Sequence, residues 1–283
     1  MSENMQVYEL SCARNNNPVK FIGVGWIPAS LGVCIAAAGL LSFVWAVLSG
    51  DVTVYVPFIS EAGADPPQSG FFSLMISVSC VWSGVTIVIR YSIVRQLLRF
   101  NRGELINSIS LVVGFLSVLG LSLVSAFPLT SANIIHDIGA ASMFVLGVTY
   151  CFLQSLLSAW MYPWHNGRVI VFYRSSITLI ATAAALITAI CQFKAKQLWA
   201  ASGIDKPDDM RLPGDPAFFW FTAAAIAEWT TVVMFIAYFF SYIREFNKVV
   251  IELDTYPLVD HFDDDIEIHF PASEHTPLYK SVL

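Results

Sequence analysis

The sequence predicts an all-α polytopic membrane protein, a bundle of six transmembrane helices with both termini in the cytosol. Of its 283 residues, 56% are hydrophobic and 13% are charged, and the mean hydropathy is +0.65. A soluble domain carries about 25% charged residues, so this chain lacks the polar surface that a soluble protein needs. A helix of about 20 mostly apolar residues crosses a bilayer. Six stretches meet this length: 21–49, 71–90, 107–127, 138–161, 172–193 and 217–242.

Composition divides the chain into three segments. Residues 1–20 form a polar N-terminal lead, residues 21–242 hold the predicted spans, and residues 243–283 form an acidic tail. From residue 242 onward there are nine acidic and three basic residues, which account for the whole net charge of −6. A polar, charged segment of this kind buries too little apolar surface to fold, so we expect the tail to be disordered.

The distribution of Lys and Arg predicts the orientation, because short cytosolic loops carry an excess of these residues. One side of the predicted spans has four of the 15: Lys194, Lys196, Lys206 and Arg211. The other side has eleven: Arg14, Lys20, Arg90, Arg95, Arg99, Arg102, Arg168, Arg174, Arg244, Lys248 and Lys280. Six spans return the chain to its starting side, so both termini are predicted to be cytosolic. Loops 50–70, 128–137 and 194–216 then face the lumen or the exterior.

The residue types that catalysis needs do not occur together. Of the five histidines, only His136 lies near a span end on the non-cytosolic side, too few for an intramembrane metal site. No Gly-x-Ser-x-Gly motif occurs, and the net negative charge disfavours nucleic-acid binding. The sequence therefore predicts a non-enzymatic protein with no cofactor, no metal and no nucleic-acid partner.

Glu228 is the one carboxylate deep within a predicted span. It lies eleven residues after Ala217, or about 16 Å from the span end and close to the bilayer midplane. An ionised carboxylate is costly there unless it is protonated, paired or exposed to water. One interpretation is a proton or cation site, or a contact with a lipid head group. The alternative is a protonated side chain that bonds to a neighbouring helix, since no second carboxylate shares its depth.

His136 and Asp137 precede the fourth predicted span on its non-cytosolic side. A histidine has a reference pKa of about 6.5, so His136 could act as a pH switch in an acidic lumen. The alternative is structural, because an aspartate at a helix N-terminus is stabilised by the helix dipole.

The segment from Pro57 to Gly70 has the composition of a rigid turn, with three prolines, two glycines, two acids and no base. It could be a lumenal docking surface, or a loop that packs over the bundle and sets the entry of the second span. Its candidate residues are Pro57, Ser60, Glu61, Gly63, Pro66, Pro67, Ser69 and Gly70.

Arg95, Arg99 and Arg102 are spaced i, i+4 and i+7, which places them on one face of a predicted juxtamembrane helix. Such a stripe attracts anionic lipid by about 1 kcal/mol per residue. The alternative is that these residues only set the topology of the chain.

The acidic tail contains a candidate sorting signal. Tyr256 is followed three residues later by the apolar Val259, some dozen residues beyond the last predicted span. Clathrin adaptors bind this pattern as an extended peptide, through a tyrosine pocket and an apolar pocket. Tyr279 and Val282 form a weaker second copy.

Several stretches together resemble the DRAM family of damage-regulated autophagy modulators. That family lies in a wider group with the FGF-receptor-activating protein and yeast phosphoinositide-kinase scaffolds. The resemblance covers roughly residues 20–250 and is carried by residues 46–52, 57–70, 136–140, 150–155 and 227–229. It implies a six-span protein of lysosomal or endosomal membranes that promotes autophagy, without an agreed catalytic activity.

These observations lead to three hypotheses about function. The first is a non-enzymatic lysosomal or endosomal protein that modulates autophagy, and with it apoptosis, through lateral or cytosolic partners and adaptors that bind the tail. The second is a proton-coupled transporter or lipid-handling protein that uses Glu228, with a bound lipid as its ligand. The third is a plasma-membrane scaffold for phosphoinositide kinases that uses Arg95, Arg99 and Arg102 with the acidic tail.

Overall fold

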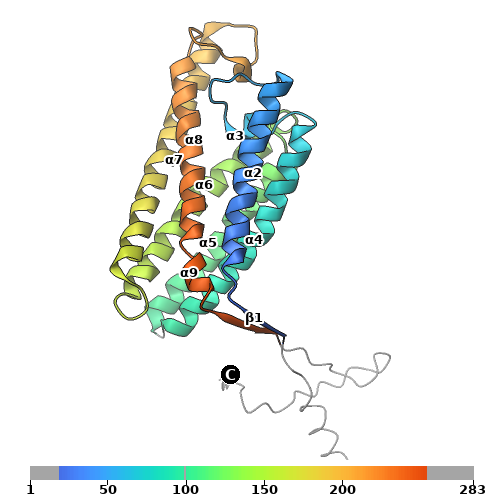
Figure 1. Ribbon diagram of the computed structural model, residues 1–283. Coiled ribbons are helices and arrows are strands. Elements are labelled where there is room, and N and C mark those ends of the chain that lie inside the picture. The colour runs from blue at the N-terminus through green and yellow to red at the C-terminus, as the bar shows by residue number, and fades with distance from the viewer. Residues whose placement is uncertain (1–18, 99, 254–283) are drawn as a thin grey trace, which may run out of the picture. The chain divides into compact units, whose positions relative to one another are not determined.

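The computed structural model describes residues 19–98 and 100–253 and contains six helices long and apolar enough to cross a membrane (Figure 1). They confirm the predicted all-α six-span fold. The helices are α2 (Trp26–Ser49), α4 (Gln68–Leu97), α5 (Asn101–Ala126), α6 (Asn133–Trp160), α7 (Arg168–Ser202) and α8 (Phe218–Phe240). Shorter elements are α3 (Ile59–Ala62), the 3-10 helix η1 (Asp208–Met210) and α9 (Ile243–Phe246).

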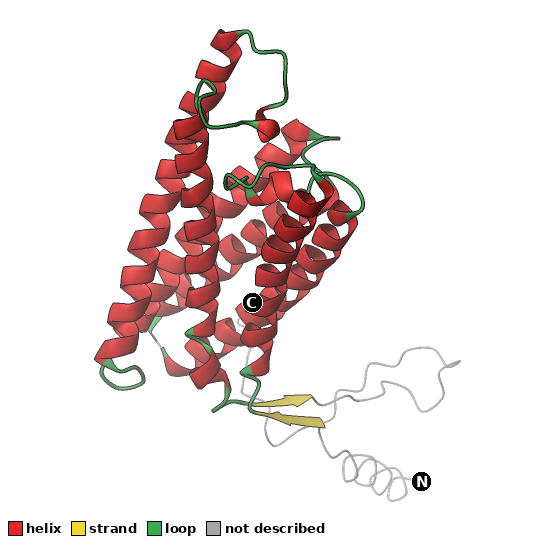
Figure 2. Cartoon of the chain, turned by 45° about the horizontal axis from the view of Figure 1, so that its top comes forward, coloured by secondary structure: helices red, strands yellow, loops and turns green. Residues whose placement is uncertain are grey.

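A two-stranded antiparallel sheet lies outside the helical unit of residues 25–247, within a second unit (Figure 2). It pairs β1 (Val19–Ile22) with β2 (Val250–Leu253), and Lys20 forms an ion pair with Glu252 across the strands. Two predictions are therefore wrong in part: residues 21 and 22 are strand and not span, and residues 243–253 are ordered. Hydropathy alone misplaced the first boundary, because the apolar Phe21 and Ile22 are equally suited to a strand.

The six long helices form a closed ring. Each packs against its neighbour in the chain, and α2 packs against α8. Close approach is clearest between α5 and α6, where a Cβ added to Gly120 would lie 2.7 Å from the carbonyl oxygen of Gly139. Small residues at such a contact let two helices pack tightly within a bilayer. The ring has two ends, each formed by connections between the long helices. The α3 end contains residues 50–67, 127–132 and 203–217. The α9 end contains residues 161–167 and 241–247.

Several helices extend beyond the predicted spans. Helix α7 has 35 residues, a length of about 52 Å, against roughly 30 Å of hydrocarbon. Lys194 and Lys196 consequently lie on α7 and not in a loop, and the helix ends at Gly203, whose φ of 66° is left-handed. Helix α4 likewise continues to Leu97, seven residues beyond the predicted end.

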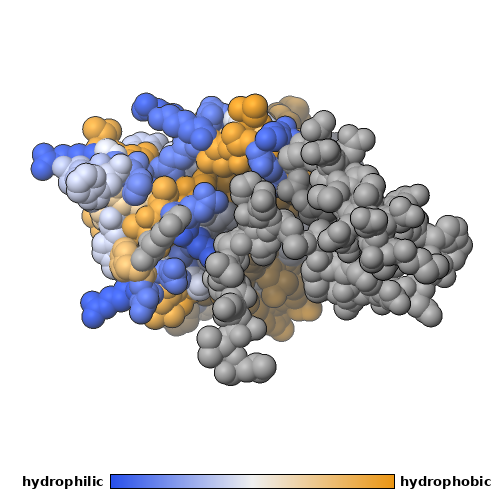
Figure 3. All heavy atoms as spheres, turned by 90° about the horizontal axis from the view of Figure 1, so that it is seen from below, coloured by the Kyte–Doolittle hydropathy of each residue, from blue (hydrophilic) through white to orange (hydrophobic). Residues whose placement is uncertain are grey.

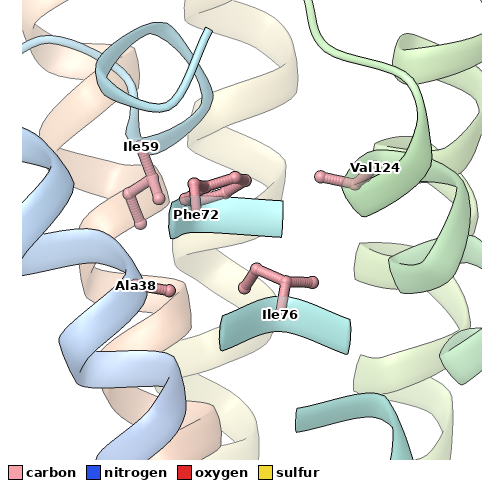
Figure 4. Packing of buried hydrophobic residues seen from close by; sticks show 5 residues of the cluster. All are labelled: Ala38, Ile59, Phe72, Ile76 and Val124. Atoms are coloured by element: carbon pink, nitrogen blue, oxygen red, sulfur yellow. The ribbon is translucent and has the colours of Figure 1, made fainter. Parts of the chain in front are cut away.

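Large apolar side chains are exposed along the ring, as a lipid-facing surface requires; examples are Val33, Leu40, Val81, Phe172 and Leu179. Figure 3 views the molecule from the α9 end, where hydrophilic side chains lie beside these apolar flanks. Inside the ring, Ile59 of α3 projects toward Phe72 and Ala38, with Ile76 and Val124 completing the buried cluster (Figure 4). The segment before the second span is therefore part of the core.

Candidate functional site

A buried ion pair at the α3 end joins two loops that are 150 residues apart in the sequence. Arg211 donates from Nη1 to Oε1 of Glu61 at 2.9 Å and from Nη2 to Oε2 at 3.0 Å. The Arg211 side chain is 1% exposed and that of Glu61 is 6% exposed. The guanidinium carbon also lies 4.9 Å from the ring centre of Phe221 and 5.4 Å from that of Phe58. We call these four residues the Arg211 cluster.

The Arg211 cluster holds the backbone that leads into α3. Oε2 of Glu61 accepts the N–H of Phe58 at 2.8 Å, and Oε2 of Glu228 accepts the N–H of the next residue, Ile59, at 3.0 Å. Trp229 Nε1 donates to the carbonyl oxygen of Pro57 at 3.0 Å. Residues 57, 58 and 59 are therefore held by hydrogen bonds to Glu61 of α3 and to Glu228 and Trp229 in the middle of α8.

These contacts fix the orientation of the Glu228 side chain. They also correct the expectation that no second carboxylate lies at its depth. Glu228 lies in the middle of α8. Its carboxylate accepts a hydrogen bond from the backbone N–H of Ile59, which belongs to the connection between α2 and α4. A second carboxylate, Glu61, accepts the adjacent N–H, so Glu228 is not alone at its depth. Hydropathy could not show this, because the loop that carries Glu61 folds back into the ring.

Burial raises the pKa of the Glu61 carboxyl above its usual value of 4.5, while the hydrogen bonds and charge of Arg211 oppose the rise. Arg211 bonds to Glu61 and not to Glu228, whose hydrogen-bond partner is the N–H of Ile59. Chemically, the arrangement can hold a proton or a polar group at the inner surface of the ring.

The segment from Pro57 to Gly70 packs onto the bundle, as one of its two interpretations predicted. Pro57, Glu61 and Gly63 are buried, Ser60 and Ser69 are half-buried, and Pro66, Pro67 and Gly70 are exposed. A Cβ on Gly63 would lie 2.5 Å from the ring of Phe72, so no larger residue fits there. Two further bonds anchor the segment, from Gln68 Nε2 to Asp51 Oδ2 at 2.6 Å and from Thr130 Oγ1 to the carbonyl oxygen of Ala64 at 3.1 Å.

His136 is buried and ties α5 to α6. Its Nδ1 lies 2.8 Å from the carbonyl oxygen of Phe127, which can only accept, so Nδ1 carries a proton. Asp137 is the fifth residue of α6, beyond the first turn, so the predicted dipole contact does not apply. It instead pairs with Lys196 of α7 at 3.5 Å on the surface.

A cavity of about 120 Å³ lies inside the ring, lined by residues of α2, α3, α4, α5, α6 and α8. Toward the α3 end its lining includes Ser60, His136 and Glu228, and toward the α9 end it includes Tyr150 and Phe239. From Glu228 to Phe239 the cavity extends eleven residues along α8, or about 16 Å. The remaining lining is almost wholly apolar, so the cavity suits a hydrocarbon group with one polar atom near Glu228.

A second buried cluster, at the α9 end, was not predicted. Arg90 of α4 and Arg174 of α7 are fully buried, and both form ion pairs with Glu245 of α9, at 2.6 and 2.8 Å. The ring of Tyr242 lies between them, 5.1 Å from the Arg90 guanidinium carbon and 4.5 Å from that of Arg174. We call these four residues the Arg174 cluster.

Neutral side chains complete the Arg174 cluster. Arg90 Nε donates to Gln154 Oε1 at 3.0 Å, and both arginines donate to Ser158 Oγ, at 3.3 and 2.8 Å. Arg174 Nε donates to Ser241 Oγ at 2.8 Å. Charge counting had treated both arginines as topology signals, but Arg174 lay two residues inside a predicted span, and a charge within a span indicates a buried partner.

The prediction that Arg95, Arg99 and Arg102 lie on one face of a single helix is wrong. Helix α4 ends at Leu97 and α5 begins at Asn101, so Arg95 and Arg102 belong to different helices. Arg99 lies outside the described residues, as do Tyr256, Val259, Tyr279 and Val282 of the candidate sorting signals. Within residues 19–98 and 100–253, no group of three or more His, Cys, Asp or Glu side chains is placed to hold a metal ion.

The loop between α7 and α8 carries a surface ion pair whose protonation can be predicted. Lys206 Nζ and the backbone N–H of Leu212 both donate to Oδ2 of Asp215 and lower the pKa of that carboxyl below its usual 3.8. The stability that this contact contributes is therefore present above pH 3.8 and lost as the pH falls through the lower folded value. An NMR titration of Asp215 should give a midpoint below 3.8, and Lys206→Gln should raise that midpoint. An unchanged midpoint in the variant would contradict the assignment.

A ring of six apolar spans with a buried ion-pair cluster near each end defines a multi-pass membrane protein. A model of the Frag1/DRAM/Sfk1/Cwh43P N-terminal domain matches residues 23–249. The chain belongs to this family, which confirms the resemblance in the sequence.

Named relatives cover most of the chain. It is 34% identical over 235 residues to DNA damage-regulated autophagy modulator protein 1 of Xenopus laevis and 33% identical over 236 residues to its Homo sapiens counterpart, covering 82% of this chain and 95% of each relative. Modulator of macroautophagy TMEM150B of Danio rerio is 28% identical over 231 residues, 79% of this chain and 88% of the relative. No solved structure matches the chain.

Proposed function

We propose that this chain is a non-enzymatic protein of lysosomal or endosomal membranes that modulates autophagy, with consequences for apoptosis, through lateral or cytosolic partners. The observation that carries the proposal is its 34% identity over 95% of a relative named as an autophagy modulator. The matched region includes both buried clusters, because it extends from residue 23 to residue 249 in the family comparison.

The α9 end faces the cytosol in this proposal. Exposed bases at that end include Arg95, Arg102, Arg168 and Arg244, whereas Arg90 and Arg174 are buried in ion pairs and do not contribute to its surface. At the α3 end Arg211 is likewise buried, which leaves few bases to oppose the acids of that surface. The positive-inside rule then supports cytosolic termini.

The proposal is tested by autophagic flux in cells that lack the protein. Re-expression of the wild-type chain should restore the turnover of autophagosome cargo, and a tagged copy should co-localise with a lysosomal marker. Unchanged flux after both deletion and re-expression would refute the proposed function, and confinement to the plasma membrane would refute the location and favour the scaffold hypothesis.

Replacing Tyr256 with Ala should move the protein from lysosomes to the cell surface, because the adaptor's tyrosine pocket would lose its ligand. Surface biotinylation of the full chain measures the change. Tyr279→Ala is the matched control and should have the smaller effect, since its motif is the weaker copy. Equal lysosomal residence of wild type and Tyr256→Ala would exclude this signal.

The cavity favours lipid handling or proton-coupled transport as a second candidate function. Its apolar lining and the carboxylate of Glu228 fit a lipid chain with one polar group. A Glu228→Gln variant keeps an oxygen that can accept the Ile59 N–H but loses the charge and the titratable proton. It should fold normally and lose activity in a reconstituted flux or lipid-scrambling assay. Full activity of the variant would eliminate the role of Glu228.

A further inference from the structure

The two arginines of the Arg174 cluster converge on one carboxylate. Arg90 Nη1 pairs with Oε2 of Glu245 at 2.6 Å, and Arg174 Nη2 pairs with Oε1 at 2.8 Å, so each oxygen faces its own guanidinium. Oε1 accepts no hydrogen bond from the described residues, because Arg174 Nη2 donates to the carbonyl oxygen of Ser241, so Glu245 fills the oxyanion position between the two arginines only in part.

The charges of the cluster do not balance. Two guanidinium groups face one carboxylate, and the other described side chains that bond to them are neutral: Gln154, Ser158 and Ser241. One positive charge is therefore in excess among groups that are almost fully buried, where an unbalanced charge is costly. A phosphate monoester carries about −1.5 to −2 at pH 7 and would balance the pair better than a carboxylate does.

Glu245 is the accessible member of the cluster. Its side chain is 22% exposed, against 1% for Arg90 and 0% for Arg174. It lies on α9, a four-residue helix that follows α8 after a turn at Ser241 and Tyr242. Within the described residues no long helix follows α9, so its release breaks its own contacts with α2 and with the two arginines but displaces no later span.

Other bases lie at the same end of the ring as this site. Arg102, Arg168 and Arg244 are exposed near the ends of α5, α7 and α9 at this end of the ring. Basic residues near a membrane surface attract anionic head groups by about 1 kcal/mol each, which raises the local concentration of phosphate-bearing ligands.

We propose that Arg90 and Arg174 form a binding site for a phosphate monoester, and that Glu245 occupies this site as an internal substitute. Binding of the phosphate displaces Glu245 and releases α9 from the ring. The phosphate belongs to a lipid head group or to a soluble molecule, and the same chemistry recognises both. The inference does not depend on the proposed role in autophagy.

The test uses the full-length protein in phosphatidylcholine nanodiscs. Dioctanoyl phosphatidic acid supplies a lipid phosphate monoester, dioctanoyl phosphatidylserine supplies an anionic lipid without one, and glycerol 3-phosphate supplies a soluble monoester. Trypsin cleavage after Arg244, the second residue of α9, and after Lys248, which follows the helix, measures its release, since both side chains are exposed. Phosphatidic acid should speed this cleavage in the wild-type protein, and phosphatidylserine should not. A response to glycerol 3-phosphate equal to that of phosphatidic acid would support the site and assign a soluble source.

Glu245→Gln removes the internal competitor and should strengthen phosphatidic acid binding about tenfold, as thermal shift at graded lipid concentrations measures. Glu252→Gln is the matched control, since it removes one negative charge from the same post-span segment at an exposed ion pair. It should bind as the wild type does. Equal effects of the two variants, or equal cleavage with phosphatidic acid and phosphatidylserine in the wild-type protein, would overturn the proposal.

Discussion

Replacing Arg211 with Met is expected to lower the free energy of unfolding by about 3–5 kcal/mol, because it leaves Glu61 buried without a counter-charge. The same change removes the contact of the guanidinium with the rings of Phe58 and Phe221. The loop between α7 and α8 should then separate from the α3 segment. Denaturant unfolding in detergent measures the loss of stability.

Lys206→Met provides the control for Arg211→Met. Lys206 lies in the same loop and pairs with Asp215, but its side chain is 30% exposed. A surface pair of this kind is screened by solvent and contributes little to stability, so the control should remain close to wild type. Equal stability losses in the two variants would show that burial of the Glu61–Arg211 pair is not what makes it important.

Replacing Arg174 with Met is expected to lower the free energy of unfolding by about 1.5–3 kcal/mol, the cost of losing hydrogen bonds to a charged group, because Glu245 keeps its ion pair with Arg90. Arg174 donates to the hydroxyls of Ser158 and Ser241 and forms an ion pair with Glu245, so its removal deprives both hydroxyls of a charged donor and leaves Glu245 held by Arg90 alone. Helix α9 should detach, and trypsin should cleave after Arg244 more quickly than in the wild type. Thermal unfolding monitored by circular dichroism measures the stability of the spans.

Arg168→Met is the control for Arg174→Met, since it removes an exposed arginine from the first turn of the same helix. It should leave both the unfolding temperature and the cleavage rate unchanged within error. If Arg174→Met behaved in the same way, the Arg174 cluster would contribute nothing to holding α9.

The sequence was sufficient for the six spans because hydropathy depends only on composition over about 20 residues. It was not sufficient for the clusters, because Glu61 and Arg211 are 150 residues apart and meet only when two loops fold onto the ring. The same limit explains Arg90 and Arg174, which charge counting assigned to the membrane surface although both are buried. Local patterns distinguish a surface arginine from one that pairs across the bundle only where the arginine falls inside a predicted span, as Arg174 does.

Other residues of the site were identified through the resemblance to a family and not through hydropathy or charge. Glu228, Trp229 and Pro57 meet through two hydrogen bonds to the α3 segment, and the resemblance had singled out all three without a reason for their proximity. The structure supplies that reason, because the segment inserts between α2, α4 and α8. His136 lines the same cavity, but its bond to Phe127 also has a structural purpose at the end of α5.

A double-mutant cycle at Glu61 and Arg211 tests most directly whether their ion pair holds the α3 segment onto the ring. The free energy of unfolding is measured for the wild type, Glu61→Gln, Arg211→Met and the double variant. We expect each single change to be strongly destabilising and the double variant to be little worse than either, so that the coupling energy is close to the cost of one single change, about 3 kcal/mol. Additive losses, with no coupling between the two positions, would contradict this account.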